Sequence, residues 1–571
     1  MNTPLSYILQ RKARRVRRKA RLTLLHLRAQ LAATALGRML LPVAIRDDNG
    51  DVNLAVGTSA NNSILVAIRS VHVHGGLVAA TLLLIAVAAF TLITSTFSNR
   101  LETVGRPTPA PLTKGSPFAL DVAILPFAAV NSQDAVCVQF AEQLSQSLAQ
   151  LSEASLKSPT TTLMSSGIKI WQPAQIDFHT PAPSEEGQNW MARFAADRKV
   201  DIVLFGVVNC RSDNTGAAAG TGTISVAPQF YVSPEYFKHA PELVGTYDFG
   251  AFERTINKAS DSIALDEFNQ ELLNRAKTVV LLGQGFEYYA RDDYKNYLNA
   301  AQIFQNLLDS NTLTDQRGQA VLHYILGNAY MRASTNDCED VLPDMLRQAE
   351  HQYGMAVATE PQFASAYVGL GSIMSQWAQN ASLNATTDTS MQSALVQDYL
   401  LRGQEYYTKA LKARINPVNA NIEFRVAMGK GQSLVIEHDL LAPGDETLLT
   451  EAESYLNLVI SGYISGTDNQ PSLKSIAAHA YSLLGDVYLS QSYFEDALNQ
   501  YQHAQGLASD EKLRTDIALR IADISTMNGD GCMAAQQLQI AINTVCVDDR
   551  ADFAARALDA QHVCRASFDP R

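Results

Sequence analysis

AYSLLGDVYLSQSYFEDALNQYQHAQGLAS, residues 480–509, is the stretch that decides the fold of this chain. Its apolar and small residues recur three or four positions apart in two blocks, which is the spacing of one face of an α-helix. A small residue lets two helices cross closely, and aromatic or Leu side chains fill the neighbouring gaps. The residues that carry this pattern are Tyr481, Leu484, Gly485, Tyr488, Ala497, Tyr501 and Ala504. The stretch therefore predicts a pair of packed helices.

The same pattern recurs along the second half of the chain, which is typical of a repeat architecture. It resembles the tetratricopeptide repeat, because the seven residues fall at consensus positions 4, 7, 8, 11, 20, 24 and 27. A second unit consists of Leu326, Gly327 and Tyr330, followed after an insert by Ala349, Tyr353, Ala356 and Pro361. Weaker units follow at residues 282–304, where Gly283 takes the small position, and at 367–410, 429–459 and 522–541. The resemblance implies a mainly α fold, an α-solenoid of six helix pairs with a closing helix, over residues 266–571.

Stacked helix pairs of this kind leave a concave groove that is lined by the first helix of each pair. The resemblance implies that the groove binds peptides or protein segments. The candidate groove residues, taken from consensus positions near 2, 5, 6 and 9, are Asn328, Arg425, Lys430 and Arg520. Family members that clamp a carboxylate use Lys, Asn and Arg at such positions, and only Asn328 resembles that pattern. For the other three candidates, a solvated helix face is the alternative interpretation.

Residues 75–97, GGLVAATLLLIAVAAFTLITSTF, form a stretch of 23 residues without a charge. As a helix it would be roughly 34 Å long, enough to cross a hydrocarbon core of about 30 Å. A cleavable signal peptide would be shorter and nearer the start, and a buried core helix would be amphipathic. We therefore predict one transmembrane helix over residues 75–98, followed by a Pro-rich linker over residues 99–117.

Charge divides the chain at the same place. Residues 1–74 hold 12 Lys and Arg against 3 Asp, a net charge of +9, and the remaining residues hold 33 Lys and Arg against 54 Asp and Glu, or −21. Because basic residues mark the cytoplasmic side of a membrane span, the amino terminus is predicted to be cytoplasmic. The rest of the chain is then extracytoplasmic, and the protein is a single-pass protein of a bacterial cell membrane.

The cytoplasmic arm, residues 1–74, contains a dense basic cluster. Its members are Arg11, Lys12, Arg14, Arg15, Arg17, Arg18, Lys19 and Arg21. The cluster continues into a Leu-rich amphipathic segment, so it could lie on anionic lipid, bind nucleic acid or act only as a topology signal. We do not expect nucleic-acid binding, because the cluster has no interleaved aromatic residues and the arm has no helix-turn-helix pattern. Residues 43–71 alternate apolar stretches with turn residues, which predicts short strands of unknown role.

A second domain is predicted over residues 118–265, where strand and helix patterns alternate in the manner of an α/β or α+β fold. The expected elements are strands at 121–127, 168–173 and 200–208, helices at 135–151 and 185–198, and a hairpin further on. The succession resembles the amino-terminal domain of TolB-type periplasmic proteins. The residues that carry this resemblance are Ala123, Leu125, Pro126, Phe127, Val200, Asp201, Val203, Leu204, Gly206 and Val208. The resemblance implies a binding or scaffolding module.

All six Cys follow the predicted span, and none has the spacing of a zinc site, which leaves disulfides or buried thiols. Cys137 lies early in the first helix, and Cys210 lies just past the strand at 200–208. Parallel strands end at one edge of a sheet, so we expect these two residues to lie close together. A disulfide between them requires Cα atoms within roughly 7 Å.

No nucleophile elbow, phosphate-binding loop or metal motif stands out, and the eleven His are scattered singly. We therefore expect a protein that is not an enzyme and that has no cofactor. The favoured hypothesis is a membrane-anchored scaffold whose extracytoplasmic groove binds a protein or peptide partner. The alternative is a transmembrane sensor whose array binds a partner outside and whose basic arm acts on DNA or a signalling protein inside.

Overall fold

The computed structural model describes most of the chain from Leu120 onward and three short strands before it. The described residues are 43–47, 50–58, 64–68, 120–130, 134–157, 167–176, 190–212, 221–257, 261–310, 313, 315–334, 342–383, 389–413, 421–465, 471–544 and 550–568. They belong to two compact units, which divide after Pro107, within the stretch predicted to be a linker.

The first unit contains a small antiparallel sheet. Its strands are β1 (Val43–Asp47), β2 (Gly50–Thr58) and β3 (Ile64–Ile68), with β2 in the middle. These strands coincide with the apolar stretches of residues 43–71. The basic cluster at residues 11–21 and the predicted span at residues 75–98 lie outside the described residues. Within the described ranges, no helix combines the length and apolar character needed to cross a membrane.

The second unit begins with a mixed sheet. Its strands are β4 (Leu120–Ile124), β5 (Ala128–Ala129), β6 (Ile168–Trp171), β7 (Ile202–Ser212), β8 (Thr221–Val232), β9 (Gly245–Asp248) and β10 (Phe252–Asn257). The main path runs β10-β8-β7-β4-β6, and β4 pairs in parallel with both β6 and β7. Strand β8 pairs antiparallel with β7, β9 and β10. The parallel pairs confirm an α/β region before the helices.

Helices cover both faces of this sheet. Helix α3 (Ala135–Leu156) connects β4 and β5 to β6, and the 3-10 helix η1 (Pro173–Gln175) and α4 (Trp190–Arg198) precede β7. Successive residues of a strand point to opposite faces. Accordingly Leu120 and Val122 pack in the core beneath α3, whereas Ala123 packs in a separate core against α4.

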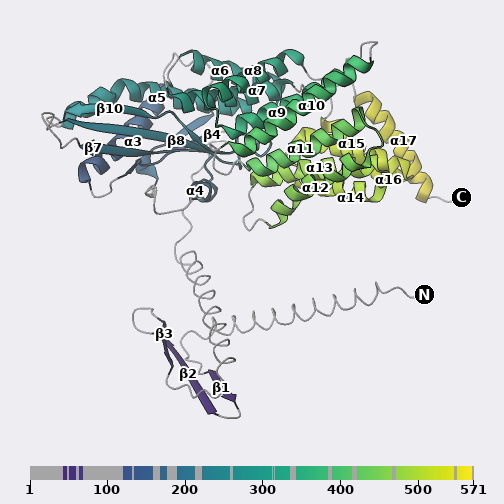
Figure 1. Ribbon diagram of the computed structural model, residues 1–571, viewed down its shortest axis with the longest axis horizontal. Helices are drawn as coiled ribbons and strands as arrows, with labels where there is room; N and C mark the ends of the chain where they lie inside the picture. The colour runs from purple at the N-terminus through teal and green to yellow at the C-terminus, as the bar shows by residue number, and fades with distance from the viewer. Residues whose placement is uncertain are drawn as a thin grey trace. The chain divides into compact units, whose positions relative to one another are not determined.

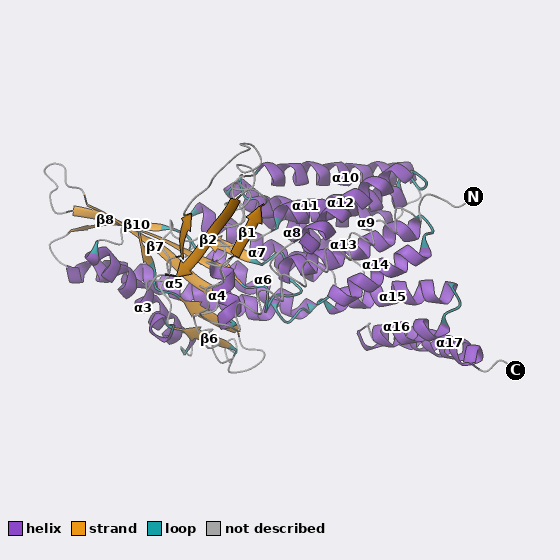
Figure 2. Cartoon of the chain, turned by 90° about the horizontal axis from the view of Figure 1, so that it is seen from below, coloured by secondary structure: helices purple, strands orange, loops and turns teal. Residues whose placement is uncertain are grey.

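The remaining helices form the solenoid, which runs in Figure 1 from α5 beside the sheet to α17 at the right. They are α5 (Asp261–Tyr289), α6 (Tyr294–Asp309), α7 (Gln316–Ser334), α8 (Pro343–Thr359), α9 (Ala364–Leu383), α10 (Thr389–Lys412), α11 (Ile422–Leu440), α12 (Glu446–Ser465), α13 (Pro471–Ser490), α14 (Phe494–Leu507), α15 (Glu511–Met527), α16 (Gly531–Thr544) and α17 (Arg550–Phe568). Consecutive helices pack as hairpins, and the hairpins stack side by side (Figure 2). The predicted α-solenoid is therefore confirmed as the architecture of this part of the chain.

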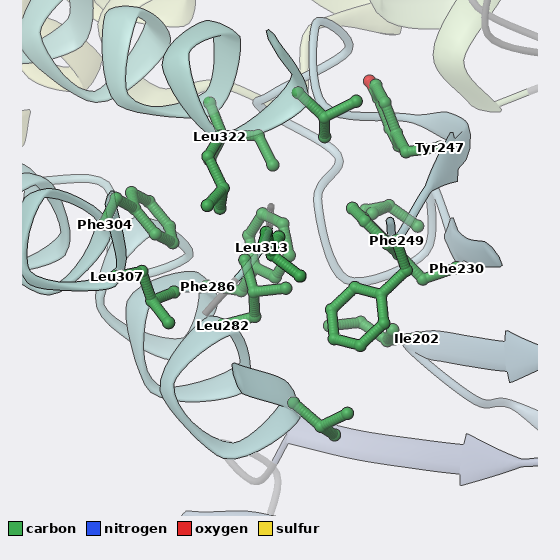
Figure 3. Packing of buried hydrophobic residues seen from close by; sticks show 14 of the residues in the cluster. Ile202, Phe230, Tyr247, Phe249, Leu282, Phe286, Phe304, Leu307, Leu313 and Leu322 are labelled. Carbon is green, nitrogen blue, oxygen red and sulfur yellow. The ribbon is translucent and has the colours of Figure 1, made fainter. Parts of the chain in front are cut away.

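Helix α5 joins the sheet to the solenoid. It packs on α3 and the sheet while it also pairs with α6, so one hydrophobic core continues from the strands into the first repeats. Figure 3 shows this core, with Phe230 of β8 and Phe286 of α5 in it. Their ring centroids are 6.2 Å apart, and Phe286 meets Phe304 of α6 at 5.6 Å. The α/β region and the first repeats therefore share their buried surface.

Glycine and tyrosine pack together where helices cross within the repeats. A Cβ on Gly485 of α13 would lie 2.6 Å from the ring of Tyr501 on α14, closer than side chains tolerate. In the same way a Cβ on Gly327 would lie 2.7 Å from Tyr353. These positions confirm the predicted role of the small residue in both units.

The first repeat, which α5 and α6 form, differs from its prediction. In this repeat Gly285, rather than Gly283, lies against Phe304, because Gly283 faces Ile168 of the sheet. Gly283 therefore lies on the face of α5 that packs against the sheet, whereas the repeat pattern predicted that it would lie where α5 crosses α6.

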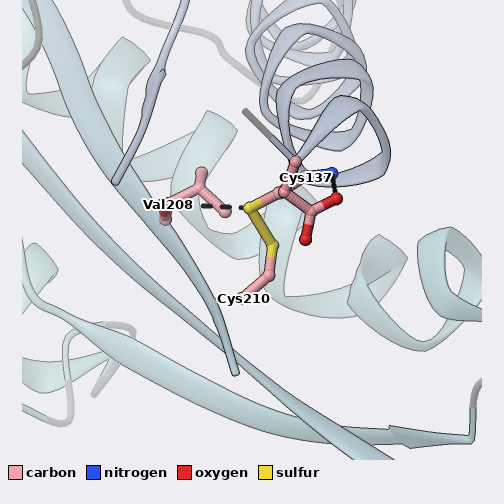
Figure 4. Close-up of a disulfide and its surroundings, with 4 residues drawn as sticks. Cys137, Val208 and Cys210 are labelled. Atoms are coloured by element: carbon pink, nitrogen blue, oxygen red, sulfur yellow. Dashed lines mark hydrogen bonds between the residues drawn. A yellow bond between two sulfur atoms is a disulfide. The ribbon is translucent and has the colours of Figure 1, made fainter. Parts of the chain in front are cut away.

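Two disulfides lie within the described residues. The structure joins Cys137, in the first turn of α3, to Cys210 of β7, with their Cα atoms 5.9 Å apart (Figure 4). These are the two residues whose proximity the strand order led us to expect. The second disulfide joins Cys532 of α16 to Cys564 of α17, with Cα atoms 4.6 Å apart. The sequence pattern did not indicate this second pair.

Candidate protein-binding groove

The four predicted groove residues are dispersed over different environments in the structure. Asn328 of α7 is only 3% exposed, and its Oδ1 accepts a hydrogen bond from the hydroxyl of Tyr353 on α8. It supports the packing within its own repeat. Lys430 of α11 lies with its Nζ 5.5 Å from the ring centroid of Tyr455 on α12, the other helix of its pair. Neither side chain lines the pocket between the first helices of the later repeats that is described below.

Arg425 of α11 is buried and lies against other parts of the same chain. Its Nη1 donates to the hydroxyl of Tyr324 on α7, at 3.4 Å. Burial opposes its charge, but the nearby Tyr324, Glu242 and Tyr247 outweigh this effect and raise the pKa of Arg425. Arg425 is therefore covered by protein and unavailable to a partner.

The chain itself occupies part of the concave side of the solenoid. Residues 233–244, which we call the β8–β9 connection, follow β8 and pack against first helices of the repeats. The Glu242 carboxylate accepts hydrogen bonds from Arg332 of α7, at 2.7 Å from Nε and 3.0 Å from Nη2, and from the Tyr289 hydroxyl of α5 at 2.7 Å. Burial would raise the pKa of Glu242, but Arg332 and Tyr289 outweigh it and lower the pKa to about 2.

Backbone carbonyls of the β8–β9 connection also accept hydrogen bonds from residues of the repeats. Tyr324 donates to the carbonyl of Glu242 at 2.7 Å, and Arg332 donates to the carbonyl of His239 at 2.6 Å. At the other end, Ser509, just before α15, donates to the carbonyl of Lys238 at 2.8 Å. The connection therefore reaches from α5 and α7 across to the start of α15.

An open pocket of about 390 Å³ lies in the later part of the groove, between α11, α13 and α15. The residues that line it are Met428, Gln432, His479, Ser482, Leu483, Asp486, Leu513, Asp516, Leu519, Arg520 and Asp523. All of them come from the first helices of three successive repeats. Of the four predicted groove residues, Arg520 is the one that lines this pocket.

The pocket wall carries more acidic than basic groups. Asp486 accepts a hydrogen bond from the Tyr501 hydroxyl at 2.6 Å and lies 3.5 Å from Nε of Arg520. Burial nevertheless raises the pKa of Asp486 above its ordinary value. Asp523 forms an ion pair with Arg556 of α17. The side chain of Asp516 forms no hydrogen bond or ion pair with the described residues, and burial raises its pKa although Lys512 and Arg520 oppose this effect. Burial lowers the pKa of His479, which favours its neutral form.

The consensus positions held a signal for this pocket that we did not use. In the clearest repeat, positions 2, 5, 6 and 9 are His479, Ser482, Leu483 and Asp486, and all four line the pocket. Three of the four candidates named from the other repeats are basic, whereas the same positions of this repeat include the acidic Asp486. The consensus positions therefore indicate the lining of this pocket, and the charge at those positions differs from repeat to repeat.

The described residues offer no group of three or more His, Cys, Asp or Glu that could hold a metal ion. The arrangement can instead hold a polypeptide segment, because the pocket combines apolar walls with charged groups on rigid helices. The β8–β9 connection is an example within the same chain of a segment bound on this concave side through its carbonyls and one carboxylate.

Comparisons with known proteins give weak structural similarities. No family model matches the chain, and no curated protein matches it. PilF of Pseudomonas aeruginosa is 16% identical and matches 44% of this chain and 89% of its own, with a TM-score of 0.28. A thermophilic TPR protein of Thermus thermophilus is 18% identical and matches 42% of this chain and 97% of its own, with a TM-score of 0.29. The solenoid assignment therefore rests on the helix packing of this chain.

Proposed function

We propose that the protein is a non-enzymatic scaffold that binds a segment of a partner protein in the open part of its groove. The observation that carries this proposal is the pocket between α11, α13 and α15. First helices of a solenoid present such concave surfaces to partners. The β8–β9 connection fills the earlier part of the groove, so the partner binds beside it, over the later repeats.

We further propose that this scaffold is anchored in the cell membrane by residues 75–98 and displayed outside the cytoplasm. The uncharged stretch and the change from +9 to −21 support this topology. The disulfides Cys137–Cys210 and Cys532–Cys564 support it as well, because disulfides persist in oxidising compartments. The relation of the sheet to the TolB-type domain and the contact of the basic arm with lipid stay predictions.

Site-specific crosslinking in intact membranes tests the proposed function. A photo-crosslinking amino acid replaces Ser482, which lines the pocket, in the full-length chain. The matched control carries it at Asn499, an exposed position on α14, the second helix of the same repeat. We expect a defined protein to be crosslinked from position 482 and to be absent from position 499.

A second substitution shows whether the pocket selects that protein. Leu483→Arg places a bulky positive charge on the apolar wall beside Ser482 and is expected to abolish the crosslink from position 482. Identical crosslinked species from positions 482 and 499, or crosslinks to lipid alone, would contradict the proposed function.

A further inference from the structure

We propose that the pocket between α11, α13 and α15 binds a Lys or Arg side chain of the partner, with Asp516 as its principal ion-pairing group. The inference rests on the proposed function, because it names the chemistry of the segment that enters the same groove.

The charged side chains around the pocket are unevenly paired. Arg520 lies beside Asp486, and Arg556 pairs with Asp523, so each of these cations already faces a carboxylate. Asp516 is left without an ion pair among the described residues. Burial raises the pKa of Asp516, and Lys512 and Arg520, one turn away on either side of it on α15, offset this effect only in part. The pocket wall carries three carboxylates against the single guanidinium of Arg520, so a further cation beside Asp516 would balance its charge.

Asp516 lies among apolar side chains in the lining of the pocket. It lies on one face of α15 with Leu513 and Leu519, each three residues away, and all three line the pocket. Leu483 and Met428 extend the apolar wall on the facing helices α13 and α11. Lys and Arg bury an aliphatic stem along apolar surface while the charged end reaches a polar group. The pocket offers both parts of this arrangement.

The negative charges of the pocket are poorly stabilised by the protein itself. Burial raises the pKa of Asp516, and burial also raises the pKa of Asp486 although a guanidinium and a hydroxyl lie against it. A raised pKa means that the negatively charged form of a carboxylate is poorly stabilised, and a nearby cation stabilises that form. An anionic side chain in the same place would add repulsion, so the pocket discriminates against Asp and Glu.

Fluorescence anisotropy with four labelled peptides tests the inference on the purified full-length protein. The peptides are identical nine-residue sequences of Ala and Ser whose central residue is Lys, Arg, norleucine or Glu. We expect the Lys and Arg peptides to bind about fivefold more tightly than the norleucine peptide, as for a partly exposed ion pair. The Glu peptide should bind most weakly, and added salt should reduce the advantage of Lys and Arg.

Asp516→Asn removes the charge while keeping the size of the side chain. It should abolish the preference for Lys and Arg over norleucine. Asp559→Asn is the matched control, because Asp559 is exposed on α17 and outside the pocket. It should keep the full preference.

The outcomes separate this inference from the function on which it rests. Equal binding of the Lys and norleucine peptides, or a preference that survives Asp516→Asn, overturns the cation pocket. Absence of binding by all four peptides at about 1 mM also overturns it. Crosslinking from position 482 uses no peptide, so it decides independently whether the groove binds a partner.

Discussion

Glu242 shows how a single carboxylate can attach one part of a fold to another. Its side chain is 15% exposed and lies within hydrogen-bonding distance of Arg332 and Tyr289. Removing one partner of such a pair leaves the other charge buried and unpaired, which destabilises a protein strongly. We therefore expect Glu242 to contribute to stability mainly through its charge.

The pH dependence of stability tests this contribution. The pKa of Glu242 is lowered from 4.5 to about 2, so its stabilising effect is complete above 4.5 and is lost as the pH falls toward 2. Glu242→Gln should lower the free energy of unfolding by on the order of 3 kcal/mol at pH 7, and by progressively less below pH 4.5. Urea denaturation of both proteins between pH 7 and pH 3 measures the difference.

The control for this measurement is Glu495→Gln, at an exposed position on α14. It should change the free energy of unfolding by less than about 0.5 kcal/mol. A difference between wild type and Glu242→Gln that stays constant from pH 7 to pH 3 would show that the charge of Glu242 does not stabilise the fold.

Gly485 gives a second prediction at the residue scale. In a helix, replacing Gly by Ala usually stabilises by up to about 1 kcal/mol. At Gly485 the new Cβ would lie 2.6 Å from the ring of Tyr501, so Gly485→Ala should instead destabilise by about 1–3 kcal/mol. Gly506→Ala is the control, because nothing lies within 4 Å of a Cβ there. Thermal unfolding should give opposite signs for the two variants, and a stabilised Gly485→Ala protein would exclude the close helix crossing.

At the scale of elements, the sequence allowed the helices and strands to be predicted wherever a local pattern determines them. The spacing around Gly485 and Tyr501 depends on contacts within one hairpin, so it is visible in 30 consecutive residues. The α/β pattern likewise predicted β4, α3 and β7 close to their observed positions.

The β8–β9 connection could not be predicted in this way. Its residues have no helix or strand period, and its partners Arg332 and Ser509 are far away in the sequence. Only the assembled solenoid brings those groups together. For the same reason, the sequence could not reveal that Arg425 is covered or that Asp516 lacks an ion pair within the described part of the chain.

Helix α17 carries a prediction at the element scale. Its buried contacts with the preceding hairpin come mainly from the small residues Ala557 and Ala560, and the disulfide Cys532–Cys564 ties it to α16. A helix with few apolar contacts opens locally at low free energy. Replacing both Cys by Ala should therefore increase amide hydrogen exchange in α17 at least about tenfold, because the cross-link no longer limits opening.

The same exchange measurement contains its own control. Helix α7 lies in the continuous core and is remote in sequence from this disulfide, so its exchange should stay unchanged. Equal exchange of α17 in the variant and the wild type would mean that helix packing alone holds this end of the solenoid.

At the scale of the whole molecule, the second unit is organised around one continuous core. Buried residues run from β4 through α5 to α9 without a break, and further clusters follow along the later repeats. Helix α5 begins at Asp261 and belongs to both the sheet and the first hairpin. The predicted boundary at residue 265 therefore falls within a shared helix, so the α/β region and the repeats are expected to unfold together at that junction.

The β8–β9 connection also has a mechanical consequence. A solenoid whose repeats touch only their neighbours behaves as a spring, because small rotations at each joint add up along its length. Here Arg332 of α7 lies 3.6 Å from Asp510 at the start of α15, and Ser509 is tethered to Lys238. These contacts connect α7 and the β8–β9 connection directly to the start of α15, and so they fix the spacing between the early and the late repeats. A force applied to the end of the solenoid is then transmitted to the sheet, and the pocket between α11, α13 and α15 keeps its width under that force.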